Sequence, residues 1–280
     1  MKNPGLLLVN LGSPDSPSVP DVRRYLREFL MDGRVLDIPY PVRWLVVHAF
    51  ILPKRPKQSA EAYHTIWRPE GSPLVISGRK TREALQSRLD FPVELAMRYQ
   101  NPSIPGALAK LRDQGVEDLL VISLFPHYAM SSFETAVERV KAVAARLAPR
   151  MALRIQPPYY AEPDYINALA ASARPRLERG YDHLLFSFHG IPERHLHKSD
   201  PTGAHCLRVD HCCETASEAH RTCYRAQCFK TVQAFVRAAG VTRYSVSFQS
   251  RLGKDPWLRP YTDVELHRLA RLIQPVGPVG

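Results

Sequence analysis

Short apolar segments alternate along this chain with segments whose apolar residues recur at helical spacing. Residues 6–10 read LLLVN and run directly into a Gly-Ser-Pro turn, which is typical of a buried strand that ends at a loop. Over residues 21–32 the apolar positions return every three or four residues, as on one face of a helix. The first 32 residues therefore predict a strand followed by a helix.

The same pair recurs to the end of the chain. Alternating strands and helices predict a parallel sheet covered on both faces, so the expected fold class is α/β, with two doubly wound, Rossmann-like domains over 1–150 and 151–280. The expected strands are 6–10, 152–160 and 183–190, together with strands that run into loops within 93–102, 118–128 and 243–251. The expected helices are 21–32, 72–89, 104–114, 133–147, 164–178, 222–239 and 262–273.

Composition narrows the classes of partner. The net charge is +11, which suits an anionic ligand or surface, but the basic residues are scattered and form no nucleic-acid-binding motif. The glycines form neither a GxGxxG nor a GxxxxGK loop, so we expect no nucleotide. The sequence lacks a signal-peptide pattern and an apolar stretch of spanning length. We therefore expect a cytoplasmic protein, with peripheral contact to the inner membrane as a further option; oligomeric state is left open.

Polar side chains stand where the expected strands end. Ligands of open α/β sheets bind at the carboxyl ends of strands, so these positions predict a shared site. An imidazole there titrates near neutral pH and can move protons, although a structural hydrogen bond would explain it equally well. The residues at the strand ends are Asn10, Arg98, His127, His189 and Gln249.

All five cysteines fall within one short segment, in the spacing C-x5-C-C-x9-C-x4-C. An odd number of cysteines in a cytoplasmic chain argues against a disulfide framework. Four thiolates would suit a [2Fe–2S] cluster, mixed Cys and His ligands would suit zinc, and free thiols are the third alternative. The residues concerned are Cys206, Cys212, Cys213, Cys223 and Cys228, interleaved with His205, His211 and His220.

Several ordered motifs together resemble the ferrochelatase family, whose members insert ferrous iron into protoporphyrin IX to form haem. The motifs are VNLGSPDSP, MRYQNPSI, FPHYAMSSFETA, SFHGIPERH, CYRAQC and SFQSRLGKDPWLRPYTD. The resemblance implies two Rossmann-like domains of the class II chelatase type, with protoporphyrin IX and Fe²⁺ as substrates. It also implies a [2Fe–2S] cluster on four of the five cysteines, within an insertion over about 200–228.

The resemblance also implies roles for residues in these motifs. His189 matches the active-site histidine that accepts pyrrole protons and meets the Fe²⁺, and His127 is a candidate for shuttling metal or protons. Arg98 and Arg251 are expected near the propionates, although Arg98 could instead pair with a structural carboxylate. The expected substrate-binding residues are Arg98, Tyr99, Tyr128, Gln249, Arg251 and Trp257.

Residues 35–67 match the lip over the family's porphyrin mouth. The lip combines apolar residues with cations, which suits a hydrophobic substrate delivered from a membrane; an ordinary core helix followed by a solvated loop is the alternative. Its apolar members are Trp44, Leu45, Val46, Val47, Phe50, Ile51 and Leu52, and its cations are Lys54, Arg55 and Lys57.

The chain departs from the family near its end. Family members continue with a strand and a helix that carries an acidic motif, which nothing in 264–280 matches, Glu265 included. We therefore expect a second domain shortened at its carboxyl end. Two alternatives to ferrochelatase activity remain: a porphyrin- or haem-binding homologue that has lost turnover, and a chelatase for another tetrapyrrole.

Overall fold

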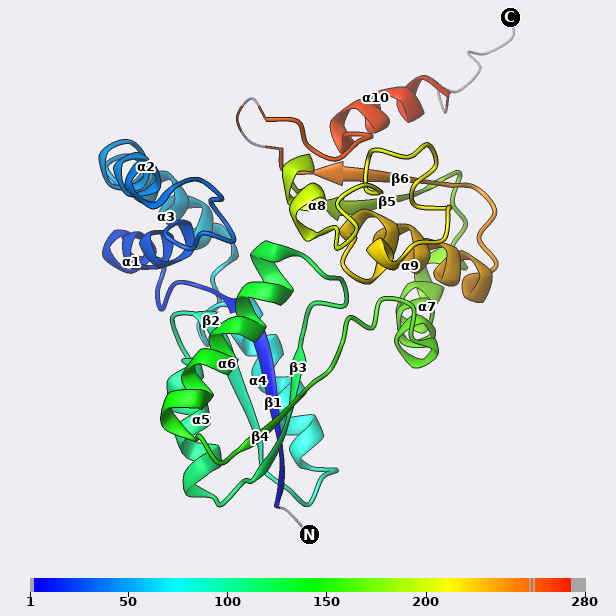
Figure 1. Ribbon diagram of the computed structural model, residues 1–280. Coiled ribbons are helices and arrows are strands. Elements are labelled where there is room, and N and C mark those ends of the chain that lie inside the picture. Colours follow the sequence, from blue (N-terminus) through cyan, green and yellow to red (C-terminus); the bar gives the residue numbers. More distant parts are fainter. Residues whose placement is uncertain (1–2, 252, 254, 273–280) are drawn as a thin grey trace, which may run out of the picture. The chain divides into compact units, whose positions relative to one another are not determined.

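The computed structural model describes residues 3–251, 253 and 255–272. The chain divides into two compact units (Figure 1). The first comprises Met1–Pro126 with Met130–Pro157, and the second comprises His127–Ala129 with Pro158–Gly280.

The first unit is built on a four-stranded parallel sheet in the order β2-β1-β3-β4. Its central strand, β1, is buried on both faces, because Leu7 and Val9 enter one core cluster while Leu6 and Leu8 enter another. Side chains alternate between the faces of a strand, so an unbroken apolar run is what a strand covered on both sides requires.

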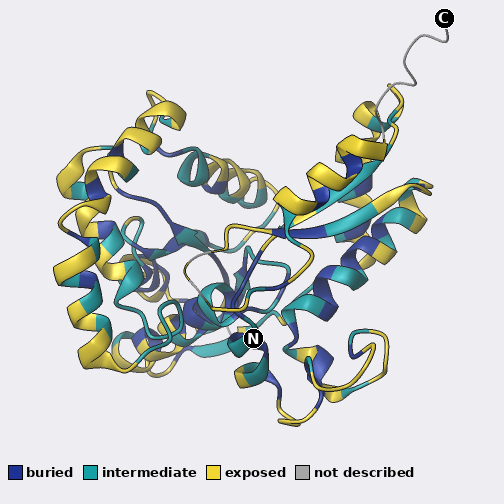
Figure 2. Cartoon of the chain, turned by 90° about the horizontal axis from the view of Figure 1, so that it is seen from above, coloured by how far each residue is buried: buried dark blue, intermediate teal, exposed yellow. Residues whose placement is uncertain are grey.

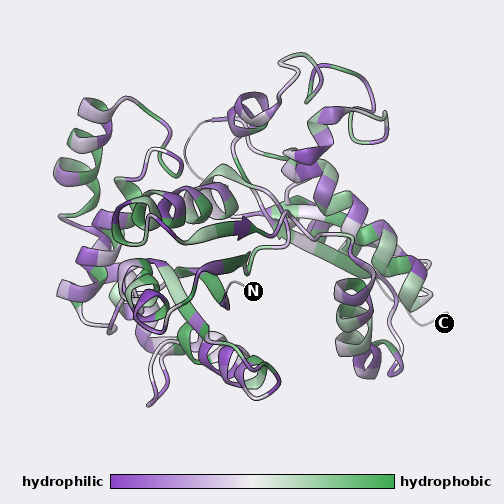
Figure 3. Cartoon of the chain, turned by 60° about the horizontal axis from the view of Figure 1, so that its bottom comes forward, coloured by the Kyte–Doolittle hydropathy of each residue, from purple (hydrophilic) through white to green (hydrophobic). Residues whose placement is uncertain are grey.

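Helices cover both faces of this sheet. α4 packs beneath β1 and β2 on the face of Leu6, while α5 and α6 pack on the face of Leu7. Figures 2 and 3 show that buried residues alternate with exposed ones, and hydrophobic residues with hydrophilic ones, along the helices of the chain. Parallel strands between two helical layers confirm the α/β class expected from the sequence.

The expected lip forms short helices beside α1. α2 is followed without a break by a π-helical segment, η1, and α3 packs against α1. The apolar residues of the lip divide between two environments: Val47 and Leu52 are buried, whereas Trp44, Leu45 and Phe50 are exposed. The segment is therefore neither a plain core helix nor a uniformly apolar surface.

The second unit contains a two-stranded parallel sheet of β5 and β6. α7 and α9 pack together, and Phe186 of β5 joins their core through its contact with Phe235. α10 packs against β6, where Thr262 is hydrogen-bonded to Ser187 and Ser247. The cysteine-containing segment follows α8 and leads into α9.

Two sequence predictions differ from the structure. β4 ends at Ile155 instead of residue 160, because Pro157 and Pro158 follow and have no N–H to donate to a ladder. β4 also pairs with β3, so the first unit extends to Pro157 instead of ending at residue 150. Residues 193–199, to which the sequence analysis assigned no element, form α8. The end of the helix expected over 262–273 lies outside the described residues.

The strands are β1 (Pro4–Gly12), β2 (Val93–Tyr99), β3 (Asp118–Ser123), β4 (Ala152–Ile155), β5 (Leu184–His189) and β6 (Tyr244–Gln249). The helices are α1 (Val19–Leu30), α2 (Tyr40–Leu45), η1 (Val46–Ile51), α3 (Arg55–Ile66), α4 (Pro73–Gln86), α5 (Ile104–Asp113), η2 (Met130–Glu134), α6 (Thr135–Leu147), α7 (Pro163–Leu177), α8 (Glu193–Ser199), η3 (Glu218–Arg221), α9 (Tyr224–Ala239) and α10 (Thr262–Leu272). Within the described part of the chain, no helix has the length and apolar character needed to cross a bilayer.

The buried face of α5 gives a test of this packing. Leu108 is fully buried in the core that α5 shares with β1 and α6. We expect Leu108→Ala to lower the free energy of unfolding by about 2–5 kcal/mol, because the truncation leaves a cavity. Leu45→Ala is the control, since Leu45 is 51% exposed, and it should change stability by less than roughly 0.5 kcal/mol. Urea unfolding measures both; equal effects would contradict this packing.

Candidate active site

His189 is the last residue of β5 and stands opposite Gln249, the last residue of β6. Its side chain is exposed, so solvent reaches the imidazole. Partial burial lowers the pKa of His189 below its ordinary value of 6.5, since desolvation disfavours the charged form. The structure thus places a neutral, accessible imidazole at the carboxyl edge of the second sheet.

The turn after His189 is joined closely to the loop that contains Trp257. Gly190 donates its N–H to the carbonyl of Gln249 at 2.7 Å, and Leu258 donates to the carbonyl of Ile191 at 3.1 Å. A Cβ on Gly190 would lie 2.8 Å from the Gln249 carbonyl oxygen and 3.4 Å from the Trp257 ring. Glycine is required here because the two backbones approach so closely, and this approach brings Trp257 beside the His189 turn.

Arg251 also belongs to this loop, and its guanidinium is held from two sides. It pairs with Asp263 at 2.9 Å and lies 4.2 Å from the ring centre of Tyr261. Leu252 and Lys254, which belong to the same motif, lie outside the described residues. Within the second unit, the structure therefore brings together His189, Gln249, Trp257 and the start of the Arg251 loop.

His127 lies in a different environment from His189. Its Nε2 is 2.8 Å from the hydroxyl of Thr231, which itself donates to the carbonyl of Tyr160 at 2.7 Å. Because that hydroxyl has only one proton, Nε2 of His127 must be the donor and Nδ1 carries the lone pair. The rings of Tyr160, Phe188 and Tyr224 surround the imidazole. Burial lowers the pKa of His127 to about 4, so it stays neutral at physiological pH.

Tyr128 is fixed by its backbone. Its N–H donates to the side-chain carbonyl of Gln227 at 2.7 Å, and Gln227 is fully buried in α9. The amide nitrogen of Gln227 in turn donates to the carbonyls of His220 and Arg221. These bonds hold the 127–129 segment against α9, which explains why it belongs to the second unit.

Arg98 and Tyr99 end β2 in the first unit, where both contact Asp32. Arg98 pairs with Asp32 at 2.5 Å and donates to Thr135 at 2.7 Å, while the Tyr99 hydroxyl donates to Asp32 at 3.0 Å. Burial alone would raise the pKa of Asp32, but hydrogen bonds from Thr135 and from the Arg34 backbone, with the charge of Arg98, hold it below its ordinary value. The structure thus gives Arg98 the carboxylate partner that was the structural alternative.

Tyr99 is fully buried, and its ring contacts those of Tyr25 and Phe29. Its side chain does not reach the surface and instead links α1 to the sheet. Sequence reasoning missed Asp32 and Thr135 as partners of this group. Thr135 lies within the motif FPHYAMSSFETA, but Asp32 ends an ordinary amphipathic segment, and no local signal distinguished it from a solvated carboxylate.

Four of the five cysteine thiols lie close enough to affect one another's ionisation. Cys223 and Cys212 both influence the pKa of Cys213, and Cys206 influences that of Cys223. The neighbouring Cys223 and burial raise the pKa of Cys213 well above its ordinary value. A guanidinium nitrogen of Arg225 lies 3.3 Å from the Cys213 sulfur. The thiols are the correct donors for an iron–sulfur cluster and lie next to one another.

Cys228 is fully buried in α9. Burial raises the pKa of its thiol well above the ordinary value, and the neighbouring Tyr224, Cys223 and Cys213 also influence it. Among the residues that the structure describes, three or more His, Cys, Asp or Glu side chains are nowhere arranged as a metal site. The [2Fe–2S] cluster expected from the sequence therefore stays a prediction.

The buried state of His127 predicts a pH dependence of stability. The folded pKa of about 4 lies below the ordinary value of 6.5, so the unfolded chain binds this proton more readily. His127 should therefore contribute no pH dependence above 6.5 and should reduce stability as the pH falls from 6.5 towards 4, by up to roughly 1.4 kcal/mol per pH unit.

His127→Gln tests this expectation, because glutamine can still donate to Thr231 but does not titrate. The difference in unfolding free energy between variant and parent, measured by urea at several pH values, should shift in favour of the variant below pH 6.5. A difference that stays constant over that range would contradict a buried, neutral His127.

Comparison with known proteins identifies the family of this chain. Residues 3–275 match the family model described as Ferrochelatase. The chain is 53% identical over 274 residues to the Ferrochelatase of Stutzerimonas stutzeri (strain A1501), covering 96% of this chain and 80% of that protein. It is 52% identical to the Ferrochelatase of Azotobacter vinelandii, covering 96% and 81%, and 52% identical to that of Opitutus terrae, covering 97% and 80%. By this similarity over nearly its whole length, the chain belongs to the ferrochelatase family.

Proposed function

We propose that this chain inserts Fe²⁺ into protoporphyrin IX to form protohaem, with His189 as the group that accepts the pyrrole protons. The observation that carries the proposal is an exposed imidazole at the carboxyl end of β5, beside the Trp257 loop. Membership of the ferrochelatase family supports the reaction. The role of His189 rests on its position and chemistry.

The reaction needs a base at the porphyrin. A free porphyrin carries two N–H groups, and the incoming Fe²⁺ replaces both protons, so two protons leave for each haem formed. The lone pair of a neutral His189 accepts a proton as the Fe–N bonds form, and the exposed ring then releases it to water. Because partial burial lowers the pKa of His189, the neutral form persists to pH values below 6.5.

Binding of the substrate requires a flat apolar contact and cations for the two propionates. Trp257 offers a broad ring beside the His189 turn, and the exposed Arg251 offers a guanidinium that Tyr261 and Asp263 orient. We assign Gln249 and Tyr128 to the same surface of the second unit. His127 supports that surface as a neutral, buried imidazole. Because Nε2 is bonded to Thr231, Nδ1 is the nitrogen of this ring that is available to a metal.

In the first unit, we assign Arg98 to binding a substrate carboxylate and Tyr99 to positioning Arg98. Arg98 is 14% exposed at its side chain, which leaves one edge of the guanidinium for a carboxylate while Asp32 and Thr135 hold the other. Tyr99 acts by bonding to Asp32 and so fixes the position of Arg98.

We also propose peripheral contact with a cytoplasmic membrane surface. Val42, Leu45 and Phe50 of the lip are each at least half exposed, and Lys54 and Arg55 follow directly along the chain. Exposed apolar side chains beside cations favour an anionic bilayer, from which an apolar porphyrin could enter the lip.

We further propose that Cys206, Cys212, Cys213 and Cys223 hold a [2Fe–2S] cluster. The support is the proximity of these thiols, which influence one another's pKa values, and the guanidinium of Arg225 beside Cys213, which would offset the charge of thiolate ligands. Such a cluster would supply cross-linking of the segment and sensitivity to oxidants. Proton transfer to His189 does not depend on the cluster.

His189→Ala should lower the rate of metal insertion by roughly 10²–10⁴-fold, the usual contribution of a general base, and should leave the dissociation constant for metal-free protoporphyrin within a fewfold of the parent value. In the parent, the rate should fall as the pH drops below the lowered pKa of His189, because the protonated ring cannot accept a proton. The insertion of Fe²⁺ or Zn²⁺ is monitored through the change in the absorption spectrum of the porphyrin.

The matched control is His267→Ala, which removes an exposed histidine from α10 of the same unit. This variant should insert metal at the parent rate. A His189→Ala protein with full activity would remove the imidazole from the mechanism.

Serine substitutions of the cysteines test the cluster. The purified protein should be brown, with visible absorption that bleaches on reduction. Cys213→Ser should remove most of this absorption, because Cys212 and Cys223 both lie close enough to influence the Cys213 thiol. Cys228→Ser, the matched control, should keep it, because we assign the four cluster ligands to the other cysteines. A colourless parent that holds one zinc ion would overturn the proposal.

A further inference from the structure

The chain turns sharply where β2 ends, and the turn contains a residue in an unfavourable conformation. Gln100 follows Tyr99 directly and has a φ of 63°. Residues other than glycine rarely adopt this left-handed region, because Cβ then approaches a backbone carbonyl oxygen. Such a conformation persists only where surrounding contacts hold it. The contacts that hold Gln100 therefore affect the residues that end β2 beside it.

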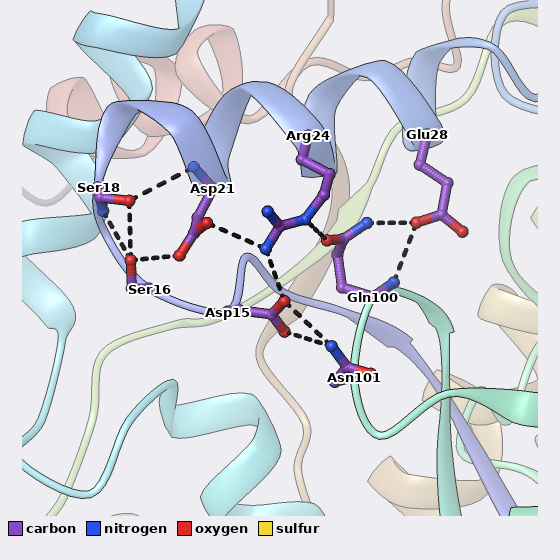
Figure 4. A network of polar contacts seen from close by, with 8 residues as sticks. All are labelled: Asp15, Ser16, Ser18, Asp21, Arg24, Glu28, Gln100 and Asn101. Carbon is purple, nitrogen blue, oxygen red and sulfur yellow. Dashed lines mark hydrogen bonds and ion pairs between the residues drawn. The ribbon is translucent and has the colours of Figure 1, made fainter. Parts of the chain in front are cut away.

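One carboxylate holds both ends of Gln100. Oε2 of Glu28 accepts from the backbone N–H of Gln100 at 3.1 Å and from its side-chain Nε2 at 2.5 Å (Figure 4). The backbone and the side chain of Gln100 are thus tied to the same atom. Hydrogen bonds to a charged acceptor are stronger than those between neutral groups, so Glu28 opposes relaxation of the turn.

Arg24 holds the remaining polar atom of the Gln100 amide. Its Nε donates to Oε1 of Gln100 at 2.7 Å, and its Nη2 pairs with Asp15 and Asp21 at 2.8 and 3.0 Å. A guanidinium can only donate and a carboxylate can only accept, so the amide fits in one orientation. Figure 4 shows Arg24 and Glu28, which are four residues apart, on the same side of α1. These two residues form a clamp on Gln100.

The end of β2 is confined at two further places. Asp32, which follows α1, pairs with Arg98 and accepts from the Tyr99 hydroxyl. Gly12, at the end of β1, lies directly against Tyr99, because a Cβ on this glycine would lie 2.0 Å from the Tyr99 carbonyl oxygen. The backbone of Tyr99 therefore has no room to move towards β1, and its position depends on the turn at Gln100.

The clamp and Arg98 also share one space. A hollow with a volume of about 270 Å³ is lined by Arg98, Gln100 and Glu28 together. Arg98 precedes Gln100 by only two residues, so both the backbone and the side chain of Arg98 adjoin the clamp. A change in the clamp consequently changes the surroundings of the Arg98 guanidinium.

We propose that Glu28 and Arg24 are positioning residues for Arg98. By holding Gln100 in its left-handed conformation, they fix where β2 ends and so where the Arg98 guanidinium meets a substrate carboxylate. They act through Gln100 and not by touching the substrate. The inference takes the role of Arg98 from the function proposed above, but the effect of the clamp does not depend on whether the chain inserts iron.

A merely structural role for the clamp predicts a different result. If the clamp served only to fasten α1 to the sheet, its loss would lower the free energy of unfolding and would weaken the binding of every porphyrin alike. A positioning role instead weakens the binding of porphyrins with free carboxylates, because only those groups pair with the Arg98 guanidinium. Comparison of a porphyrin diacid with its dimethyl ester therefore separates the two roles.

The test measures the dissociation constants of metal-free protoporphyrin and of its dimethyl ester for the full-length protein, in one detergent, by quenching of tryptophan fluorescence. Glu28→Ala should weaken diacid binding about tenfold and ester binding less than about twofold. Arg24→Met, which cannot donate, should act with the same selectivity. Glu28→Gln should bind both like the parent, since its carbonyl oxygen can still accept both bonds. Because the ratio of the two constants is the readout, partial unfolding of a variant cannot mimic the effect.

A double-mutant cycle shows whether Glu28 acts through Arg98. Arg98→Lys keeps a charge for Asp32 but lacks the second edge of the guanidinium fork, so it should also weaken diacid binding about tenfold. Adding Glu28→Ala to this variant should weaken diacid binding no further. The matched control is Glu83→Ala, which removes an exposed glutamate from α4 of the same unit and should bind both porphyrins like the parent.

Equal weakening of diacid and ester binding in Glu28→Ala would overturn the proposal, as would additive effects in the double variant. If Arg98→Lys lost the preference for the diacid while Glu28→Ala kept it, the clamp would be rejected and the role of Arg98 would stand. If neither variant distinguished the two porphyrins, the role of Arg98 would fail together with the clamp. Insertion of iron, measured separately, decides the proposed reaction.

Discussion

Burial of parallel strands on both faces is the constraint on which the rest of the first unit depends. β1 sends Leu7 and Val9 into one core and Leu6 and Leu8 into the other, so polar side chains can be accommodated only where the strand ends. Arg98 and Tyr99 stand at the end of β2, and there both reach Asp32, which follows α1. In the second unit the same rule places His189 opposite Gln249.

Burial also separates histidines that look alike in sequence. His127 and His189 both follow apolar strand-like segments, yet one is enclosed by aromatic rings and hydrogen-bonded to Thr231, while the other is exposed. The first is suited to staying neutral and rigid, and the second to exchanging protons with water. His48 represents a third condition, in which a backbone carbonyl fixes the proton on one nitrogen and leaves the other available.

The cysteine segment shows how a local motif acquires structure from its surroundings. The carboxylate of Asp200 accepts from the backbone N–H groups of His205 and Cys206. Nε2 of His205 and Nε2 of His220 both donate to the carbonyl of Cys212. Two of the three interleaved histidines that the sequence offered as alternative metal ligands thus serve to fold the loop around the thiols.

The order of strands and helices, the α/β class and the family could be predicted from the sequence, because apolar periodicity and ordered motifs are local properties. The position of His189 at a strand end followed for the same reason. The partners of Arg98 could not be predicted, because Asp32 and Thr135 lie 66 and 37 residues away from it along the chain. Only the tertiary structure buried Tyr99, exposed His189 and set the tautomer of His48, since burial and hydrogen bonding depend on which elements pack together.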